Sequence, residues 1–116
     1  MSKYKIFHNP RCSKSRQTLQ ILEEHDCEVE VILYLETAID ESVLVDILGK
    51  MSLSPRDLLR KGEQEFKDNN LKNSNYSDQE IIKFMIQHPK LIERPIVLKG
   101  DKAILGRPPE NVLELI

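Results

Sequence analysis

Apolar and polar stretches alternate along the chain and divide it into short predicted elements. Tyr4 to Phe7, an apolar run between lysines, predicts a first β-strand. The segment from Ser13 to about Asp26 lacks Gly and Pro and gathers apolar side chains on one side, which predicts a helix with Ser13 as its N-cap. Val29 to Leu35, rich in branched and aromatic residues, predicts a second strand. Strand, helix and strand in this order predict a βαβ unit with parallel strands and a right-handed crossover.

The middle of the chain changes to helical signals. Asp40 to about Gly49 predicts a helix that begins at an Asp cap and ends near a glycine. Ser54 to Asp57 has Pro at the first helical position and predicts a second helix start. Ser77 to Glu80 matches a capping box, and His88-Pro89 stops the helix that follows it. Residues from about 40 to 90 therefore predict a helical insertion.

The last part of the chain returns to strands. Ile96 to Leu98 and Ala103 to Leu105 lie on either side of Gly100-Asp101, a two-residue signal for a β-hairpin. A short amphipathic helix is predicted from about Pro109 to Ile116. These elements predict an α/β fold in a single domain over residues 1–116.

Length and composition restrict the class of protein. A chain of 116 residues can bury an ordinary hydrophobic core. Its net charge of -2 lacks the basic footprint of a nucleic-acid binder. Two cysteines, no signal-peptide pattern and no apolar run of about 18 residues predict a soluble protein of a reducing compartment, by default the cytoplasm, without membrane association. No extra apolar stripe is evident, so we expect a monomer.

The cysteines and histidines complete no metal-binding pattern. The two cysteines are too far apart for a redox Cys-X-X-Cys, and the three histidines have no zinc-ligand spacing. We therefore expect no metal, and we interpret Cys27 as a structural packing residue.

Cys12 lies where the first predicted strand passes into the first predicted helix. The first N–H groups of a helix have no intrahelical partner and carry the positive end of its dipole, so they stabilise a thiolate or a bound oxyanion. A free cysteine is ordinarily an inert packing residue, but Arg11, Lys14 and Arg16 add positive charge here and favour a reactive thiol. His8 is a second candidate, able to share a proton with the sulfur or donate to it, although a capping or surface histidine fits the same spacing.

The predicted hairpin brings two arginines opposite each other. With Gly100-Asp101 as the central turn residues, Arg94 pairs with Arg107. Like charges in opposed positions destabilise a sheet pair. A bound oxyanion would relieve the repulsion, because guanidinium groups donate in a fixed bidentate fork; two arginines splayed into solvent fit the spacing equally well. The hypothesis is that Cys12, Arg94 and Arg107 converge on one small oxyanion.

Six motifs occur in order over nearly the whole chain. They are His8-Asn9-Pro10-X-Cys12-X-X-Ser15-Arg16, Leu33-Tyr34-Leu35, Leu58-Leu59-Arg60-Lys61, Gln87-His88-Pro89, Arg94-Pro95-Ile96-Val97 and Gly106-Arg107-Pro108. In this order and at these separations they resemble the glutaredoxin-linked arsenate reductases and the related arsenate-reductase-like proteins of bacteria. The resemblance implies a thioredoxin-like fold with a helical insertion, which agrees with the predicted elements.

The resemblance also implies roles for the charged residues of these motifs. Cys12 corresponds to the nucleophile that attacks arsenate, and His8 to the group that helps keep its sulfur ionised. Arg60, Arg94 and Arg107 correspond to the arginines that bind the oxyanion. Only the resemblance places Arg60 in the site, because a helical arginine is ordinarily a solvated surface charge.

Three further residues of the motifs are implied to support the site. Pro95 corresponds to the proline that precedes a strand of the thioredoxin fold in cis and faces the helix N-terminus. Ser15 and Arg16 complete the motif of the cysteine.

The implied mechanism is nucleophilic. The Cys12 thiolate displaces an oxygen of arsenate to give a covalent adduct, and the arginines neutralise the charge on its oxygens. Glutathione then adds as a co-substrate, glutaredoxin removes it as a mixed disulfide, and arsenite leaves. The resemblance implies no metal and no tightly held cofactor, and the resolving thiol comes from outside the chain.

Other functions remain open from the residues. Ser13 and Lys14 stand where the well-studied arsenate reductases have Gly and Thr, which leaves the physiological substrate open. Cys12-X-X-Ser15 is also a monothiol glutaredoxin pattern, so a glutathione-dependent thiol transferase is one alternative. A non-catalytic regulator that binds RNA polymerase is another, although such regulators commonly carry a Cys-X-X-Cys switch that Ser15 removes. A small tyrosine phosphatase is excluded, because its loop requires Cys-X5-Arg and the arginine's position holds Thr18.

Overall fold

A computed structural model describes residues 3–37, 39–73 and 75–116 of the chain. Its contacts divide the chain into two compact units. One consists of Met1–Thr37 together with Arg94–Ile116, and the other of Ala38–Glu93. The first unit contains the sheet, and the second contains most of the helical segments.

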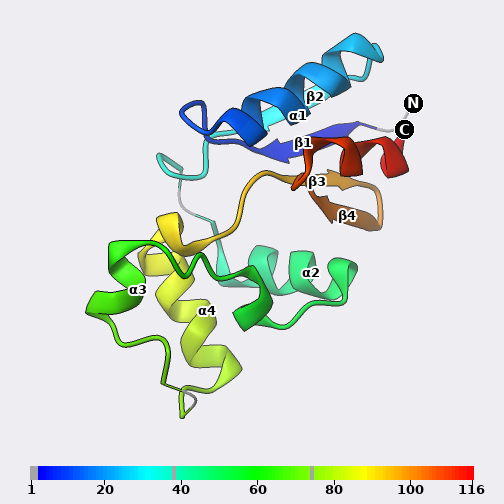
Figure 1. Ribbon diagram of the computed structural model, residues 1–116. Coiled ribbons are helices and arrows are strands. Elements are labelled where there is room, and N and C mark those ends of the chain that lie inside the picture. The colour runs from blue at the N-terminus through cyan, green and yellow to red at the C-terminus, as the bar shows by residue number, and fades with distance from the viewer. Residues whose placement is uncertain (1–2, 38, 74) are drawn as a thin grey trace. The chain divides into compact units, whose positions relative to one another are not determined.

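The first unit is built on a mixed four-stranded sheet with the strand order β2-β1-β3-β4 (Figure 1). Its strands are β1 (Tyr4–Phe7), β2 (Val29–Ile32), β3 (Ile96–Lys99) and β4 (Lys102–Leu105). β1 pairs with β2 in parallel and with β3 antiparallel, while β3 and β4 form an antiparallel hairpin. The predicted βαβ unit and the predicted hairpin are therefore both confirmed.

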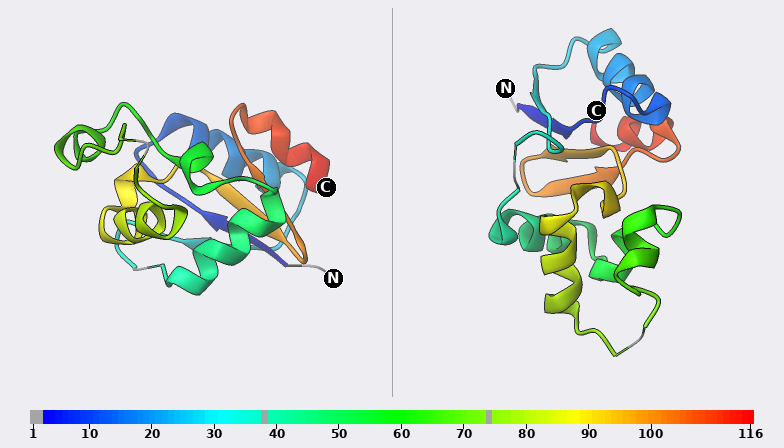
Figure 2. Two further views of the ribbon diagram at one scale, coloured as in Figure 1. Left: turned by 90° about the horizontal axis from the view of Figure 1, so that it is seen from below. Right: turned by 90° about the vertical axis from the view of Figure 1, so that its left-hand side faces the viewer.

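One face of this sheet is covered by helices. α1 (Ser13–Glu24) packs beside the C-terminal 3-10 segment η3 (Pro109–Leu115), as both views of Figure 2 show. The buried core between them and the sheet consists of Tyr4, Ile6, Leu22, Val97, Val112 and Leu115. The Tyr4 hydroxyl donates to the Leu115 carbonyl at 3.0 Å, so the core also ties β1 to the end of η3. This packing holds α1, whose N-terminus carries Cys12, against the sheet.

Two predictions for the first unit need correction. Cys12, not Ser13, is the N-cap of α1, and its side chain makes no capping hydrogen bond. The second strand ends at Ile32 instead of Leu35, because the chain turns there: the Leu33 carbonyl accepts from the N–H groups of Glu36 and Thr37, both at 2.9 Å. The short helix predicted at the C-terminus is present over Pro109–Leu115; it is a 3-10 helix that buries Pro109, Val112 and Leu115.

The second unit has five helical segments among its described residues. They are α2 (Glu41–Met51), η1 (Pro55–Leu58), α3 (Gln64–Asp68), α4 (Asp78–Gln87) and η2 (Pro89–Leu91). α4 contacts α2, η1 and η2, and its buried face presents Ile81, Ile82 and Met85. The unit is therefore organised around α4.

The helix starts predicted for this unit lead to helices of different length. Ser77 forms the predicted capping box with Glu80 at the start of α4. Asp40 occupies the predicted N-cap of α2, which extends past Gly49 to Met51. Ser54 also forms a capping box, with Asp57, but it starts only one 3-10 turn instead of a longer helix.

Two features of the second unit were not predicted. α3 forms within a polar stretch and buries none of its residues. Arg56 donates to the carbonyls of Leu71 at 3.0 Å and Asn73 at 2.7 Å, and so holds the loop before α4. Within the part of the chain that the structure describes, no helix combines the length and apolar character that crossing a membrane requires.

Candidate active site

Cys12 occupies the junction of β1 and α1. Its backbone is extended, with φ -94° and ψ 123°, and its N–H donates to the Asn9 carbonyl at 3.0 Å. The Asn9 side chain in turn accepts from the Arg11 N–H at 3.0 Å, which fixes the turn before the helix. The backbone N–H groups of Lys14 and Ser15, in the first turn of the helix, favour the thiolate form of Cys12. The thiol therefore lies at the N-terminus of the helix and remains partly exposed.

The two arginines of the predicted hairpin meet at this sulfur. Arg107 Nη1 lies 4.0 Å from Cys12 Sγ and 3.1 Å from the Arg94 carbonyl. The guanidinium of Arg94 also donates to the sulfur. The predicted register is confirmed, since Ile96 pairs with Leu105. The structure thus brings together Cys12, Arg94 and Arg107, which are far apart along the chain.

Both arginines precede a cis-proline. The Arg94-Pro95 bond is cis, as the resemblance implies, and the Arg107-Pro108 bond is cis as well, which was not predicted. The Gly106 N–H donates to the Pro95 carbonyl at 2.8 Å, so the pairing of the hairpin continues beyond β3 and β4 to the arginines.

The pKa of Cys12 lies below its ordinary value of 9.0. Partial burial is the largest single influence and raises this pKa, since it penalises the thiolate. The Ser15 N–H, the hydrogen bond and charge of Arg94, and the Lys14 N–H each favour the thiolate, and together they outweigh the burial. A lowered pKa is the property that makes a cysteine a nucleophile at neutral pH.

His8 contacts the site through Ser15. Its Nδ1 lies 2.6 Å from Ser15 Oγ, which also accepts from the Asn9 N–H at 3.1 Å. The pKa of His8 is lowered from 6.5, because burial disfavours the charged ring and because Arg16 repels it. From the sequence, His8 could share a proton with the sulfur or donate to it, or could be a capping or surface histidine. In the structure His8 is buried and its hydrogen bond goes to Ser15.

The remaining predicted residues lie in different surroundings. Arg16 Nη1 donates to the Pro10 carbonyl at 2.8 Å and so holds the loop before Cys12. Arg60 belongs to the second unit, where its Nε lies 3.3 Å from Glu63 and its Nη1 3.4 Å from Glu93. The part of Arg60 in an oxyanion site stays a prediction.

Cys27 lies among packing residues. Its side chain is partly buried against the core of the first unit, which fits the structural role expected from the sequence. Over residues 3–37, 39–73 and 75–116, no group of His, Cys, Asp and Glu side chains has an arrangement that could hold a metal ion.

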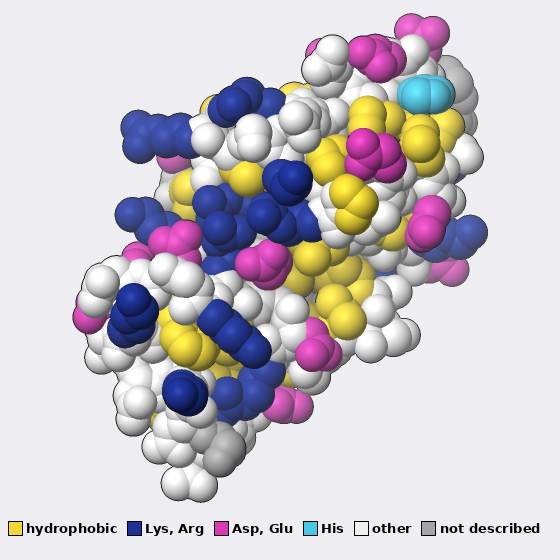
Figure 3. Space-filling view, viewed as in Figure 1, with side chains coloured by type: hydrophobic (Ala, Val, Ile, Leu, Met, Phe, Trp, Pro, Cys, Tyr) yellow, Lys and Arg dark blue, Asp and Glu magenta, His cyan; other side chains and the backbone are white. Residues whose placement is uncertain are grey.

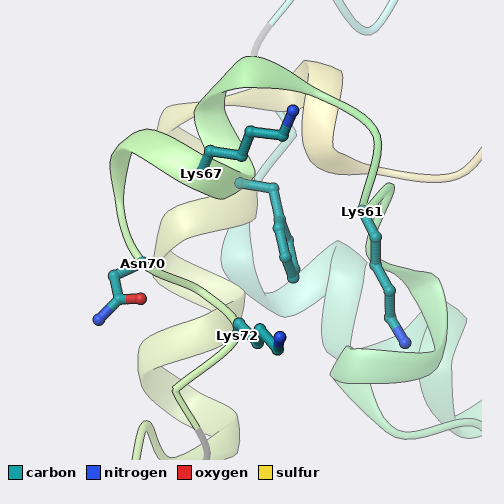
Figure 4. A pocket seen from close by; sticks show the side chains of 5 residues that line it. Lys61, Lys67, Asn70 and Lys72 are labelled. Carbon is teal, nitrogen blue, oxygen red and sulfur yellow. The ribbon is translucent and has the colours of Figure 1, made fainter.

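Positive charge also gathers in the second unit. Figure 3 shows Lys and Arg side chains around hydrophobic atoms where α3 lies. A pocket of about 360 Å³ is lined there by Phe66, Asn70 and three lysines, Lys61, Lys67 and Lys72. The three lysines are exposed and come from separate stretches of backbone (Figure 4). Its lining includes no thiol, so this pocket has charge without the nucleophile of the Cys12 site.

Sequence reasoning missed two residues beside the site. Thr18 and Gly106 lie where α1 meets the end of the hairpin, and the Thr18 side chain is fully buried. A glycine directly before an Arg-Pro pair was the only signal in the sequence, and it does not reveal what the glycine contacts.

The fold and the site define an α/β protein of the thioredoxin-like class, with a cysteine at a helix N-terminus faced by two arginines. The chain belongs to the ArsC family, whose model matches residues 7–115.

Relatives and solved structures agree with this assignment. The chain is 50% identical over 113 residues to the uncharacterized protein YfgD of Escherichia coli strain K12. The alignment covers 97% of this chain and 95% of that protein. It is 46% identical over 113 residues to an arsenate reductase of Neisseria meningitidis serogroup A, with 97% of each chain covered. The structure of an arsenate reductase from Vibrio cholerae has a TM-score of 0.96 and 43% identity, and covers 99% of this chain and 98% of that one.

Proposed function

We propose that this protein is an arsenate reductase in which Cys12 is the nucleophile. One observation carries the proposal: the Cys12 thiol, with its pKa lowered, lies at a helix N-terminus and faces both Arg94 and Arg107. Relatives that are named arsenate reductase support it, at 46% identity in Neisseria meningitidis and 43% in Haemophilus influenzae.

The first step uses the thiolate. The Cys12 sulfur attacks the arsenic atom and forms an S–As bond, and one arsenate oxygen leaves as water after taking up protons. The arsenic keeps its oxidation state in this step. Arg94 and Arg107 bind the remaining oxygens, and the N–H groups of Lys14 and Ser15 stabilise the sulfur before the attack and as it departs.

The second step reduces the arsenic. A glutathione thiol joins the adduct, and the two electrons that arsenic gains come from two sulfurs, which become a disulfide as arsenite leaves. Glutaredoxin then reduces the mixed disulfide and returns the Cys12 thiolate. An external thiol is needed because Cys27, the chain's other cysteine, is packed against the core of its unit.

The test is arsenite formation from arsenate with glutathione and glutaredoxin supplied. We expect the native chain to form arsenite, Cys12→Ser to form none, and Cys27→Ala, the matched control, to retain the activity. A second assay, with thioredoxin in place of glutaredoxin and glutathione, shows which reductant supports arsenite formation. Arsenite formation that survives Cys12→Ser, or no arsenite from the folded native chain with either reductant, would overturn the proposal.

A second candidate is a glutathione-dependent thiol transferase. The observation that favours it is the Cys12-X-X-Ser15 pattern on a helix N-terminus, where Ser15 replaces a resolving cysteine and hydrogen-bonds His8. Release of glutathione from a glutathionylated peptide by the native chain, without arsenate and dependent on Cys12, would favour this activity.

A further inference from the structure

The proposed site is assembled from two segments that are distant in sequence. The first turn of α1 supplies the Cys12 sulfur and its N–H donors, and the end of the hairpin supplies Arg94 and Arg107. The two segments must therefore be held at a fixed separation for both arginines to reach the sulfur.

Thr18 joins these two segments. Its hydroxyl donates to the Lys14 carbonyl at 2.8 Å, one turn earlier in α1, and lies 3.4 Å from the Gly106 carbonyl. Lys14 is one of the two residues whose N–H groups face the Cys12 sulfur. Gly106 directly precedes Arg107 and donates to the Pro95 carbonyl, next to Arg94. A single buried side chain thus contacts both halves of the site.

Because Gly106 has no Cβ, the side chains of Thr18 and Pro95 pack closer to its backbone than any other residue would allow. A Cβ atom at this position would lie 2.6 Å from Thr18 Oγ1 and 2.8 Å from Pro95 Cγ. Both atoms are buried, and the proline ring is rigid, so neither neighbour can move aside without shifting its segment. Arg107 Nη1 lies 4.0 Å from Cys12 Sγ, and a shift of the Gly106 segment would lengthen this contact and weaken the attraction between the guanidinium and the thiolate.

We propose that Thr18 and Gly106 are positioning residues that set the separation between the Cys12 thiolate and the arginines Arg94 and Arg107. The proposal rests on the proposed function, because it gives these arginines a role at the sulfur. It assigns no contact with substrate to Thr18 or Gly106. Their effect passes through the charge that reaches the sulfur, and so through the pKa of Cys12.

The test is titration of the Cys12 thiolate by its ultraviolet absorbance, in a Cys27→Ala background where Cys12 is the only thiol. This readout requires no substrate, so it distinguishes failure of this proposal from failure of the proposed arsenate reduction. The variants are Gly106→Ala, Thr18→Val, which removes the hydroxyl at nearly constant shape, and Thr18→Ser, which keeps it. Gly49→Ala and Thr37→Val are matched controls, because Gly49 has nothing near its Cβ position and Thr37 is exposed.

We expect the pKa of Cys12 to rise most in Gly106→Ala and less in Thr18→Val, and to stay at the native value in Thr18→Ser and in both controls. Each increase of one unit in the pKa of Cys12 lowers the fraction of thiolate about tenfold at pH values below the pKa. A purely structural role would lower thermal stability and leave this pKa unchanged in the folded variants, and that result would overturn the proposal. If Gly106→Ala does not fold, the comparison of Thr18→Val with Thr18→Ser decides, and equal pKa values in those two variants would reject it.

Discussion

Removing the Arg107 charge perturbs the thiolate through the contact between Arg107 Nη1 and Cys12 Sγ. At the 4.0 Å between Arg107 Nη1 and Cys12 Sγ, unit charges attract by about 4 kcal/mol at an effective dielectric constant of about 20, and by about 1 kcal/mol in water. Both side chains are half-buried, and the guanidinium spreads its charge over three nitrogens, so we take an intermediate value of about 2 kcal/mol. That free energy corresponds to roughly a 30-fold change in an equilibrium constant.

Alkylation by iodoacetamide measures this effect, because only the thiolate reacts. In the Cys27→Ala background, we expect Arg107→Gln to move the pH profile of the alkylation rate upward and to slow the reaction on its acidic limb by roughly 30-fold. Arg107→Lys keeps a charge but loses the planar guanidinium, so its alkylation rate should lie between those of the native chain and Arg107→Gln.

Arg11→Gln is the matched control for this experiment. It removes the same charge from an exposed residue next to Cys12 whose backbone N–H, not its side chain, makes the local hydrogen bond. We expect it to move the profile little, because exposed charges are screened. Equal shifts in Arg11→Gln and Arg107→Gln would show that overall charge, and not the placement of Arg107, sets the pKa, and would refute the reasoning.

Four further predictions concern stability and its pH dependence. Ser15→Ala removes the buried partner of both His8 and the Asn9 N–H, and should lower the free energy of unfolding by about 1–3 kcal/mol in urea denaturation, while the exposed Ser13→Ala changes it by less than about 0.5 kcal/mol. The pKa of His8 is below 6.5 in the folded chain, so the unfolded chain binds the extra proton and stability should fall as the pH drops through 6.5; His8→Asn should lack this component, and an identical pH dependence would contradict the assignment. Ser77→Ala removes the cap of α4 and should cost about 1 kcal/mol in the same measurement. Tyr4→Phe removes the hydrogen bond to Leu115 and should cost about 1 kcal/mol, and an unchanged free energy of unfolding would show that this bond contributes nothing net.

Local signals in the sequence predicted the elements that they directly specify. The Gly100-Asp101 turn fixed the register of the hairpin, and with it the meeting of Arg94 and Arg107. The capping box at Ser77 began α4 as expected. These features depend on residues only a few positions apart, so the sequence contains the information that decides them.

Two elements end earlier than their sequence signals predicted. The apolar run to Leu35 continues past the end of β2, but Leu33 accepts two N–H groups and turns the chain. Ser54-Pro55 signals a helix start, yet the chain becomes extended at Leu59, which forms a β-bridge with Ile92. No local pattern reveals either event.

The same distinction applies to the site. The position of Cys12 at a helix N-terminus followed from the order of strand and helix, although the cysteine itself, and not Ser13, became the cap. The link from His8 to Ser15, and the contact of Thr18 with Gly106, depend on how α1 lies against the sheet. That placement is a property of the packed core and cannot be read from spacing.

The proposed function requires a covalent bond between arsenate and the Cys12 sulfur, which intact-mass spectrometry can detect. The native chain is mixed with arsenate without glutathione, and the mass is measured under conditions that preserve a thiol adduct. We expect the mass to increase by that of one arsenic acid less one water, in the native chain and in Cys27→Ala but not in Cys12→Ser. No such adduct on the native chain, or an adduct that persists in Cys12→Ser, would contradict it.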